Sequence, residues 1–168
     1  MSSTSESSLS PGLPVKDFRL PDVRGGQASL SEILAEKKAM IVFYRGGWCP
    51  LCNMQLSKIT ASYGEFERRG VEIIAVSNEA VEKGEKLLRK LGPPYPLVAD
   101  LEGEVLEELG LVVKKRDLLG VVLGKHDFAH PAAILVDQQS HIEWSYRGRN
   151  YRDRPSVDLL LSAIDERE

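Results

Sequence analysis

Three continuous apolar runs constrain the fold more than any other feature of this chain. They are AMIVFY at residues 39–44, VEIIAVS at 71–77 and AAILVD at 132–137. Each has the length of a β-strand, and an unbroken apolar run is typical of a strand that is covered on both faces. The sequence therefore predicts a sheet buried between two layers, as in α/β proteins.

Helical patterns lie between and after these runs. Apolar residues recur at helical spacing from Leu56 to Phe66, and Gly70 ends that segment. Further helices are expected in four segments, which are 25–38 with Ser29 or Ser31 as N-cap, 79–92, 103–110 and 156–168 capped by Ser156. Together with the runs, these helices predict an α/β fold with a mixed central sheet flanked by helices.

Shorter strands and loops complete this outline. An edge strand is expected within 13–23, a short strand at 95–100 and a strand–turn–strand hairpin over 132–148. Residues 112–128 are interpreted as a loop. We expect one domain over residues 13–168, preceded by a Ser-rich, disordered lead-in over residues 1–12.

Composition and charge argue against several classes of function. The chain of 168 residues has a net charge of −3, so it lacks the basic excess that draws proteins to nucleic acid. Its apolar runs are far shorter than the roughly 20 residues that cross a bilayer, and residues 1–12 do not resemble a secretory signal. We therefore expect a cytoplasmic protein with no membrane partner. Because that compartment is reducing, the cysteines must be explained by chemistry or by packing.

Both cysteines lie in the stretch FYRGGWCPLC, residues 43–52. Pro50 fits the first position of a helix, which leaves Cys49 as the N-cap and Cys52 in the first turn. A helix start stabilises a thiolate, and the spacing lets the two sulfurs form a disulfide. Two cysteines alone cannot complete a four-ligand zinc site, so a redox dithiol is favoured over a metal site or two inert thiols.

Several segments together resemble the peroxiredoxin-like (alkyl hydroperoxide reductase/thiol-specific antioxidant) branch of the thioredoxin-fold superfamily. KDFRLPDVRGGQASLSEIL resembles the opening of that family, FYRGGWCPLC its active-site strand and loop, YPLVADLEGEVLEELG a later strand and helix, and HPAAILVDQQSHIEWSYRG its terminal hairpin. The resemblance covers almost everything from about Leu13 onward. It implies a thioredoxin-like fold with a peroxiredoxin-type N-terminal extension.

The cysteine loop departs from the signature of that family, which is P-x-x-x-T-x-x-C with a peroxidatic last Cys. Laid on RGGWCPLC, the signature places Cys52 at the peroxidatic position, Cys49 at the Thr and Arg45 at the Pro. The family's activating Arg corresponds to Pro131. Trp48, just before Cys49, is instead similar to the W-C-x-x-C of thioredoxins. The scaffold thus resembles a peroxiredoxin, and the site resembles a thioredoxin.

The thioredoxin-like half of this resemblance carries further expectations. Pro131 resembles the cis-proline of thioredoxins, so we expect a cis His130–Pro131 bond that faces the cysteines. Trp48 is expected to limit water access, Arg45 to help hold a thiolate and His130 to tune a thiol near neutral pH. Each also fits a plainer role, in packing, as a solvated cation or as a hydrogen-bonded side chain. The Arg-rich stretch 148–155 is interpreted as a polar loop.

Two enzymatic hypotheses follow, and both end in a Cys49–Cys52 disulfide. In a thiol peroxidase, the resemblance implies that Cys52 attacks a hydroperoxide and Cys49 resolves the sulfenic acid. In a thiol–disulfide oxidoreductase, Cys49, expected nearer the surface, attacks a protein disulfide. The peroxidase is favoured because the rest of the chain follows that scaffold, and an intact cysteine pair argues against a non-catalytic binding module.

The expected partners follow from the same chemistry. The substrate is a hydroperoxide, and a thioredoxin-like protein or a small thiol is expected to reduce the disulfide. No organic cofactor and no metal is expected, since sulfur carries the electrons. The resemblance also allows a homodimer.

Overall fold

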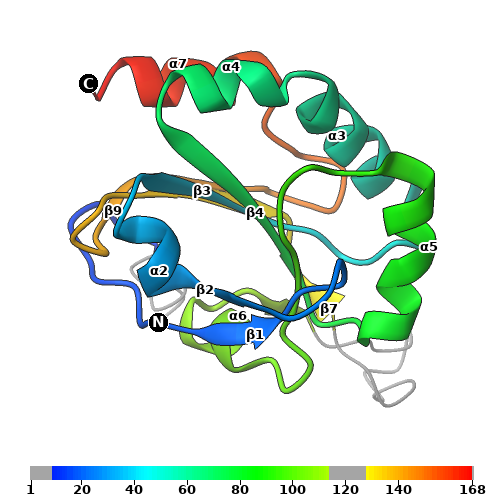
Figure 1. Cartoon of the computed structure of the whole chain (residues 1–168). Helices are drawn as coiled ribbons and strands as arrows, with labels where there is room; N and C mark the ends of the chain where they lie inside the picture. The colour runs from blue at the N-terminus through cyan, green and yellow to red at the C-terminus, as the bar shows by residue number, and fades with distance from the viewer. Residues whose placement is uncertain (1–8, 114–127, 168) are drawn as a thin grey trace.

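The structure is a computed structural model that describes residues 9–113 and 128–167. A five-stranded sheet forms its centre (Figure 1). The strand order is β5-β4-β3-β8-β9. The strands are β3 (Lys38–Phe43), β4 (Val71–Ser77), β5 (Leu97–Ala99), β8 (Ala132–Val136) and β9 (Ile142–Arg147). Two smaller sheets pair β1 (Arg19–Pro21) with β2 (Gln27–Ser29), and β6 (Val112–Val113) with β7 (Phe128–Ala129).

The three apolar runs of the sequence are the three inner strands of this sheet. β3 pairs in parallel with β4 and antiparallel with β8, while β4 pairs in parallel with β5 and β8 antiparallel with β9. Inner strands have neighbours on both edges and layers on both faces, which is why their sequences are mostly apolar. The predicted mixed sheet, including the hairpin of β8 and β9, is confirmed.

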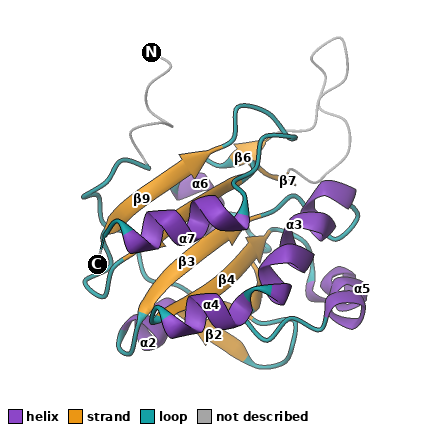
Figure 2. Ribbon diagram, turned by 90° about the horizontal axis from the view of Figure 1, so that it is seen from above, coloured by secondary structure: helices purple, strands orange, loops and turns teal. Residues whose placement is uncertain are grey.

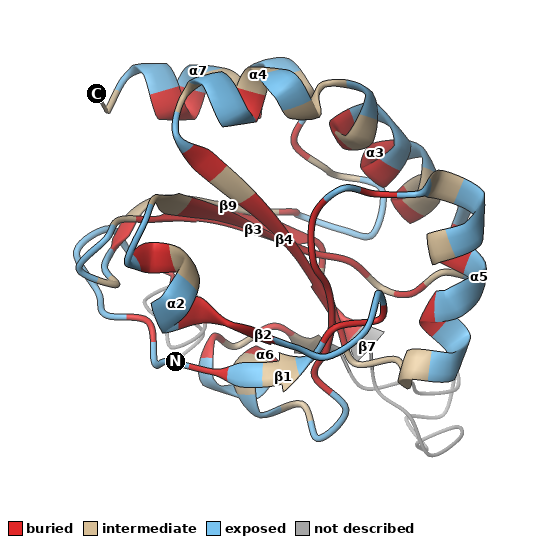
Figure 3. Ribbon diagram, viewed as in Figure 1, coloured by how far each residue is buried: buried red, intermediate tan, exposed pale blue. Residues whose placement is uncertain are grey.

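Two helical layers cover the sheet (Figure 2). The helices are α2 (Leu30–Leu34), α3 (Pro50–Ala61), α4 (Tyr63–Arg68), α5 (Val81–Leu91), α6 (Glu104–Glu108) and α7 (Val157–Asp165). Met40 and Val42 of β3 pack on the face of α3, α4, α5 and α7. Ile41 and Phe43 pack on the face of α2, α6 and the N-terminal segment. The buried residues therefore concentrate along the sheet, between the two layers (Figure 3).

Two serines cap helices as predicted, but one predicted helix is divided into two. Ser29 caps α2 by accepting from the amide of Glu32, and Ser156 caps α7. The segment after the cysteines was expected to be a single helix up to Gly70. It is instead divided into α3 and α4 at Ser62, whose φ of −105° and ψ of 12° leave the helical region.

The expected boundary at Leu13 needs a correction for the part of the lead-in that the structure describes. Leu9 is buried in the core on the α2 and α6 face, and the amide of Gly12 donates to the carbonyl of Ile142 at 2.7 Å. An apolar side chain and a β9 carbonyl thus hold residues 9–12 against the domain. Residues 1–8 of the lead-in, and 114–127 of the expected loop, lie outside the described residues.

In the two described ranges, none of the helices combines the length and apolar character needed to cross a membrane.

Candidate active site

The two cysteines lie where the chain leaves β3 and enters α3. Pro50 is the first residue of α3 and Cys49 is its N-cap, as the sequence predicts. The Cys49 sulfur accepts the amide hydrogen of Cys52 at 3.4 Å. The side chain of an N-cap residue normally accepts this bond with an oxygen atom. Here a sulfur accepts it, so the Cys49 sulfur lies where the amides at the helix start favour a negative charge. The two cysteines are not joined by a disulfide in this structure.

Both sulfurs are more deeply buried than the sequence suggests. Cys49 is 2% exposed and Cys52 is fully buried, within the core on the α3 and α7 face. The expectation that Cys49 stays accessible at the helix start is therefore wrong. The physical reason is tertiary, because a loop from the other end of the chain packs over the start of α3, as described below.

Burial controls the ionisation of Cys52. Desolvation, followed by a hydrogen bond to the Cys49 side chain, raises the pKa of Cys52 from 9.0 to about 11. The positive charge of Arg154 and the amide of Arg45, 3.4 Å from the Cys52 sulfur, lower the pKa but do not offset burial. Cys52 is thus a neutral thiol near pH 7, although a helix start by itself would favour a thiolate.

Arg154 is the site residue that the sequence did not identify. Its Nη2 lies 3.6 Å from the Cys49 sulfur, and its Nη1 donates to Gln55 Oε1 at 3.3 Å. It comes from the Arg-rich stretch 148–155, interpreted above only as a polar loop. That interpretation missed one signal: Arg154 stands directly before Pro155 and Ser156, the cap of α7. A residue tied to a helix start is fixed in space, and α7 packs on the same face as the cysteines.

Arg45 and Trp48 form the outer part of the site. The Arg45 guanidinium lies over the Trp48 ring, 4.9 Å from its centroid, and over the Tyr151 ring at 5.2 Å. The backbone amide of Arg45 therefore donates to the Cys52 sulfur, while its guanidinium group lies between two aromatic rings. Trp48 is 56% exposed, so one side of its ring remains in contact with solvent.

Two side chains hold the glycine loop that precedes Cys49. The Gly47 amide donates to Glu79 Oε1 at 2.9 Å, and the Gly47 carbonyl accepts from Asn53 at 3.0 Å. A Cβ atom added to Gly46 would clash with the Glu79 carboxylate and the Trp48 indole nitrogen. Glycine at position 46 thus leaves room for these two side chains, and the loop that presents Cys49 is held on both sides.

The expected cis bond before Pro131 is wrong, because the described residues contain no cis peptide bond. The Pro131 carbonyl accepts from the Gly148 amide at 3.0 Å, directly beyond the β8–β9 pair Ala132 and Arg147. Pro131 thus extends the hairpin ladder with an ordinary trans chain. The His130 ring donates from Nε2 to the Gly148 carbonyl, and burial lowers the pKa of His130. Among the described residues, the polar contacts of the sulfurs come from Arg45, Arg154 and the cysteines, not from His130.

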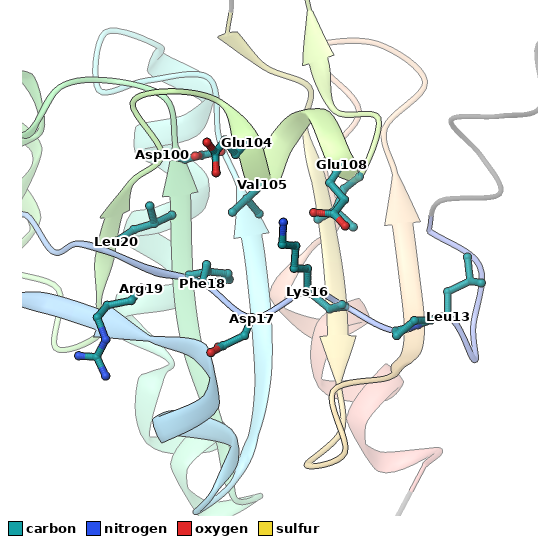
Figure 4. Close-up of a pocket in the computed structure, with 13 residues that line it drawn as sticks. Leu13, Lys16, Asp17, Phe18, Arg19, Leu20, Asp100, Glu104, Val105 and Glu108 are labelled. Atoms are coloured by element: carbon teal, nitrogen blue, oxygen red, sulfur yellow. The ribbon is translucent and has the colours of Figure 1, made fainter.

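A cavity of about 380 Å³ lies elsewhere, between the N-terminal segment 13–20 and α6 (Figure 4). Val15, Phe18 and Leu109 line it and belong to the core on the α2 and α6 face. The cysteines belong to the core on the opposite face of the sheet. This cavity therefore serves neither sulfur. Within the described ranges, no three His, Cys, Asp or Glu side chains gather as they would around a metal ion.

Comparisons with solved structures establish the fold. A crystal structure of peroxidoxin BcpB from Mycobacterium tuberculosis superposes with a TM-score of 0.80 at 22% identity, covering 95% of this chain and 99% of that one. Peroxiredoxin Q of Xanthomonas campestris gives a TM-score of 0.74 at 21% identity, over 89% of this chain and 90% of that one. The protein has the thioredoxin-like fold of these peroxiredoxins, as expected.

Sequence comparisons extend this result. Peroxiredoxin Bcp of Escherichia coli is 26% identical over 150 residues, 89% of this chain and 91% of that protein. Thiol-disulfide oxidoreductase ResA of Halalkalibacterium halodurans is 31% identical over only 96 residues, 56% of this chain and 53% of that protein. The profile of the AhpC/TSA family matches residues 11–145, which include β3, both cysteines, β8 and the first part of β9. The chain belongs to the AhpC/TSA family.

Proposed function

We propose that the protein is a thiol peroxidase that reduces hydroperoxides through Cys49 and Cys52. Membership of the AhpC/TSA family and the likeness to peroxiredoxin Bcp over 89% of the chain support this reaction. The observation that carries it is the contact between the Arg154 guanidinium and the Cys49 sulfur, 3.6 Å apart. A cation beside a thiol stabilises the thiolate, which is the nucleophile that attacks a peroxide.

Cys49 is the attacking residue in this proposal, and Cys52 resolves. Cys49 receives the Arg154 cation and the Cys52 amide, which both favour a negative sulfur. Cys52 is fully buried, and burial, followed by a hydrogen bond to Cys49, raises its pKa, so it stays a neutral thiol. This assignment reverses the one that the resemblance implies, where Cys52 attacks. The reason is that Arg154 reaches the first cysteine of the pair.

The reaction balances over two steps. The Cys49 thiolate attacks one oxygen of the hydroperoxide, the O–O bond breaks, and the leaving alkoxide takes a proton to become an alcohol. Cys49 is then a sulfenic acid. The Cys52 sulfur attacks the Cys49 sulfur, a disulfide forms, and the hydroxyl leaves as water with the Cys52 proton. The Cys52 amide already donates to the Cys49 sulfur, which holds the two cysteines next to each other for this second step.

The deciding experiment assigns the sulfenic acid. Reduced Cys49→Ser and Cys52→Ser variants receive a brief pulse of hydrogen peroxide, and mass spectrometry measures the added oxygen. We expect a sulfenic acid at Cys49 in Cys52→Ser and none in Cys49→Ser. Stopped-flow measurement of peroxide consumption by the unmodified protein is the companion assay. A rate no faster than that of free cysteine at the same pH excludes the peroxidase.

A thiol–disulfide oxidoreductase is the second candidate, and the local likeness to ResA favours it. The same Cys-X-X-Cys then attacks a protein disulfide. It is less well supported because Cys49 is 2% exposed, and a disulfide on a folded protein cannot approach such a recessed sulfur as hydrogen peroxide can. Rapid reduction of insulin disulfides, together with slow peroxide consumption, would favour this candidate.

A further inference from the structure

Two arginine side chains and two aromatic rings stack on one another at the surface of the protein. The Arg45 guanidinium lies between the rings of Trp48 and Tyr151, 4.9 Å and 5.2 Å from their centroids. The Arg152 guanidinium lies over the Tyr151 ring at 5.3 Å, and its Nε donates to the Tyr151 hydroxyl. Trp48 is 56% exposed and Tyr151 45% exposed, so both rings meet solvent although each is stacked. We name these four residues the Arg45–Arg152 column.

The column borders Cys49 from two sides. Trp48 precedes Cys49 in the chain, while Tyr151 and Arg152 belong to the loop whose Arg154 contacts the Cys49 sulfur. The column therefore belongs to the two chain segments that meet at the Cys49 sulfur. The chain has a net charge of −3, yet three arginines, at 45, 152 and 154, gather on these two segments. The positive charge is thus local and lies beside the reactive sulfur.

We infer that the column binds a small thiol that carries carboxylates, and that this thiol reduces the Cys49–Cys52 disulfide. The inference rests on the peroxidase function proposed above, which produces the disulfide. Guanidinium groups pair with carboxylates, and exposed aromatic rings pack against the rest of a small molecule. A small thiol also suits the depth of Cys49, which is 2% exposed and out of reach of a thiol fixed on a folded protein.

The reduction balances with two molecules of this thiol. The thiolate of the first attacks the Cys49 sulfur, the disulfide breaks, and Cys52 leaves and takes a proton. The product is a mixed disulfide between the small thiol and Cys49. A second thiolate attacks the sulfur of the small thiol, releases the Cys49 thiolate beside Arg154, and yields the oxidised small disulfide. Two electrons pass from the two thiols to the protein.

Glutathione and its diethyl ester provide a matched pair of probes, because they share a thiol and differ in two carboxylates. The full-length protein is oxidised with diamide, freed of reagent and mixed with each probe at equal thiolate concentration. Acid quenching and mass spectrometry then follow loss of the disulfide. We expect the free acid to react at least about fivefold faster at low salt, the size of one good surface ion pair, with the preference shrinking in high salt.

Two variants locate the effect. Arg152→Gln removes a cation of the column, and we expect it to reduce the ratio of the free-acid rate to the ester rate. Arg19→Gln removes an exposed cation on β1, where Arg19 pairs with Glu32, and we expect that ratio to stay unchanged. Because each variant is judged by the ratio of its free-acid rate to its ester rate, a change in the general reactivity of its disulfide affects both rates and cancels.

Three outcomes decide the matter. Equal rates for glutathione and its ester, or a ratio that Arg152→Gln leaves intact, overturn the inference. Faster reduction by thioredoxin than by glutathione assigns the surface to a protein partner and also overturns it. Failure of the peroxidase function is distinguishable, because oxidation of the reduced protein by hydrogen peroxide is measured separately and diamide supplies the disulfide in any case.

Discussion

Replacing Arg154 by glutamine removes the cation from the Cys49 sulfur and keeps a polar side chain of similar shape. Two unit charges separated by the observed 3.6 Å interact by about 1 kcal/mol in water, and by about 4–5 kcal/mol at an effective dielectric constant of about 20. The site lies between these limits, because Cys49 is buried while Arg154 is partly exposed. The negative charge that the Cys49 sulfur carries as it attacks therefore loses about 1.4–4 kcal/mol of stabilisation, which corresponds to about tenfold to a thousandfold.

The rate falls less than this loss of stabilisation alone would cause. A less stabilised thiolate is a better nucleophile, with a Brønsted coefficient of about 0.4–0.5 for thiols, so about half of the logarithmic loss is recovered. We expect the second-order rate constant with hydrogen peroxide to decrease about fourfold to fortyfold at pH 7. Stopped-flow mixing of reduced protein with peroxide, repeated from pH 6 to pH 10, measures it. The deficit should narrow toward pH 10, where hydroxide removes the thiol proton without help from a cation.

Two controls separate this electrostatic role from a structural one. Arg149→Gln removes the same charge from the same loop, but the Arg149 side chain is 90% exposed and pairs with Asp153, so the peroxide rate should not change. Arg154→Lys keeps the charge without the geometry that also reaches Gln55, and it should recover part of the rate. A loss below twofold in Arg154→Gln, or a deficit of constant size up to pH 10, would refute the reasoning.

Three further predictions concern the thiols and their loop. Diamide should produce a Cys49–Cys52 disulfide within the monomer, whereas a covalent dimer as the sole product on non-reducing gels contradicts the local pair. Gly46→Ala should lower the free energy of unfolding, measured by urea titration, by about 1–3 kcal/mol because the added methyl group clashes with Glu79. Gly64 has open space around it, so Gly64→Ala is the control and should not lower the free energy of unfolding. The unfolded Cys52 thiol ionises near pH 9 and the native one near 11, so the unfolded state binds fewer protons in this window and stability falls as pH rises. The loss should be about 2–3 kcal/mol smaller in reduced Cys52→Ala, where buried tyrosines with raised pKa values such as Tyr44 and Tyr95 still contribute. A Cys52→Ala variant that loses as much as the unmodified protein between pH 8 and pH 11 contradicts the assignment.

The sequence alone identified the inner strands of the sheet and the position of the cysteines. Unbroken apolar runs identify inner strands because only strands covered on both faces tolerate them, and β3, β4 and β8 are such strands. Pro50 fixed the start of α3 because proline lacks the amide that a first helical residue leaves unused. Local rules of this kind depend on neighbours in the chain, so the sequence contains all that they need.

The tertiary structure decided what surrounds the sulfurs. Arg154 lies 105 residues from Cys49 in the chain, and no periodicity links the two residues. Burial of Cys52, which reverses the effect expected of a helix start, depends on α5, α7 and the sheet packing around it. Electrostatic and desolvation energies act through space, so they become known only when distant segments have been brought together.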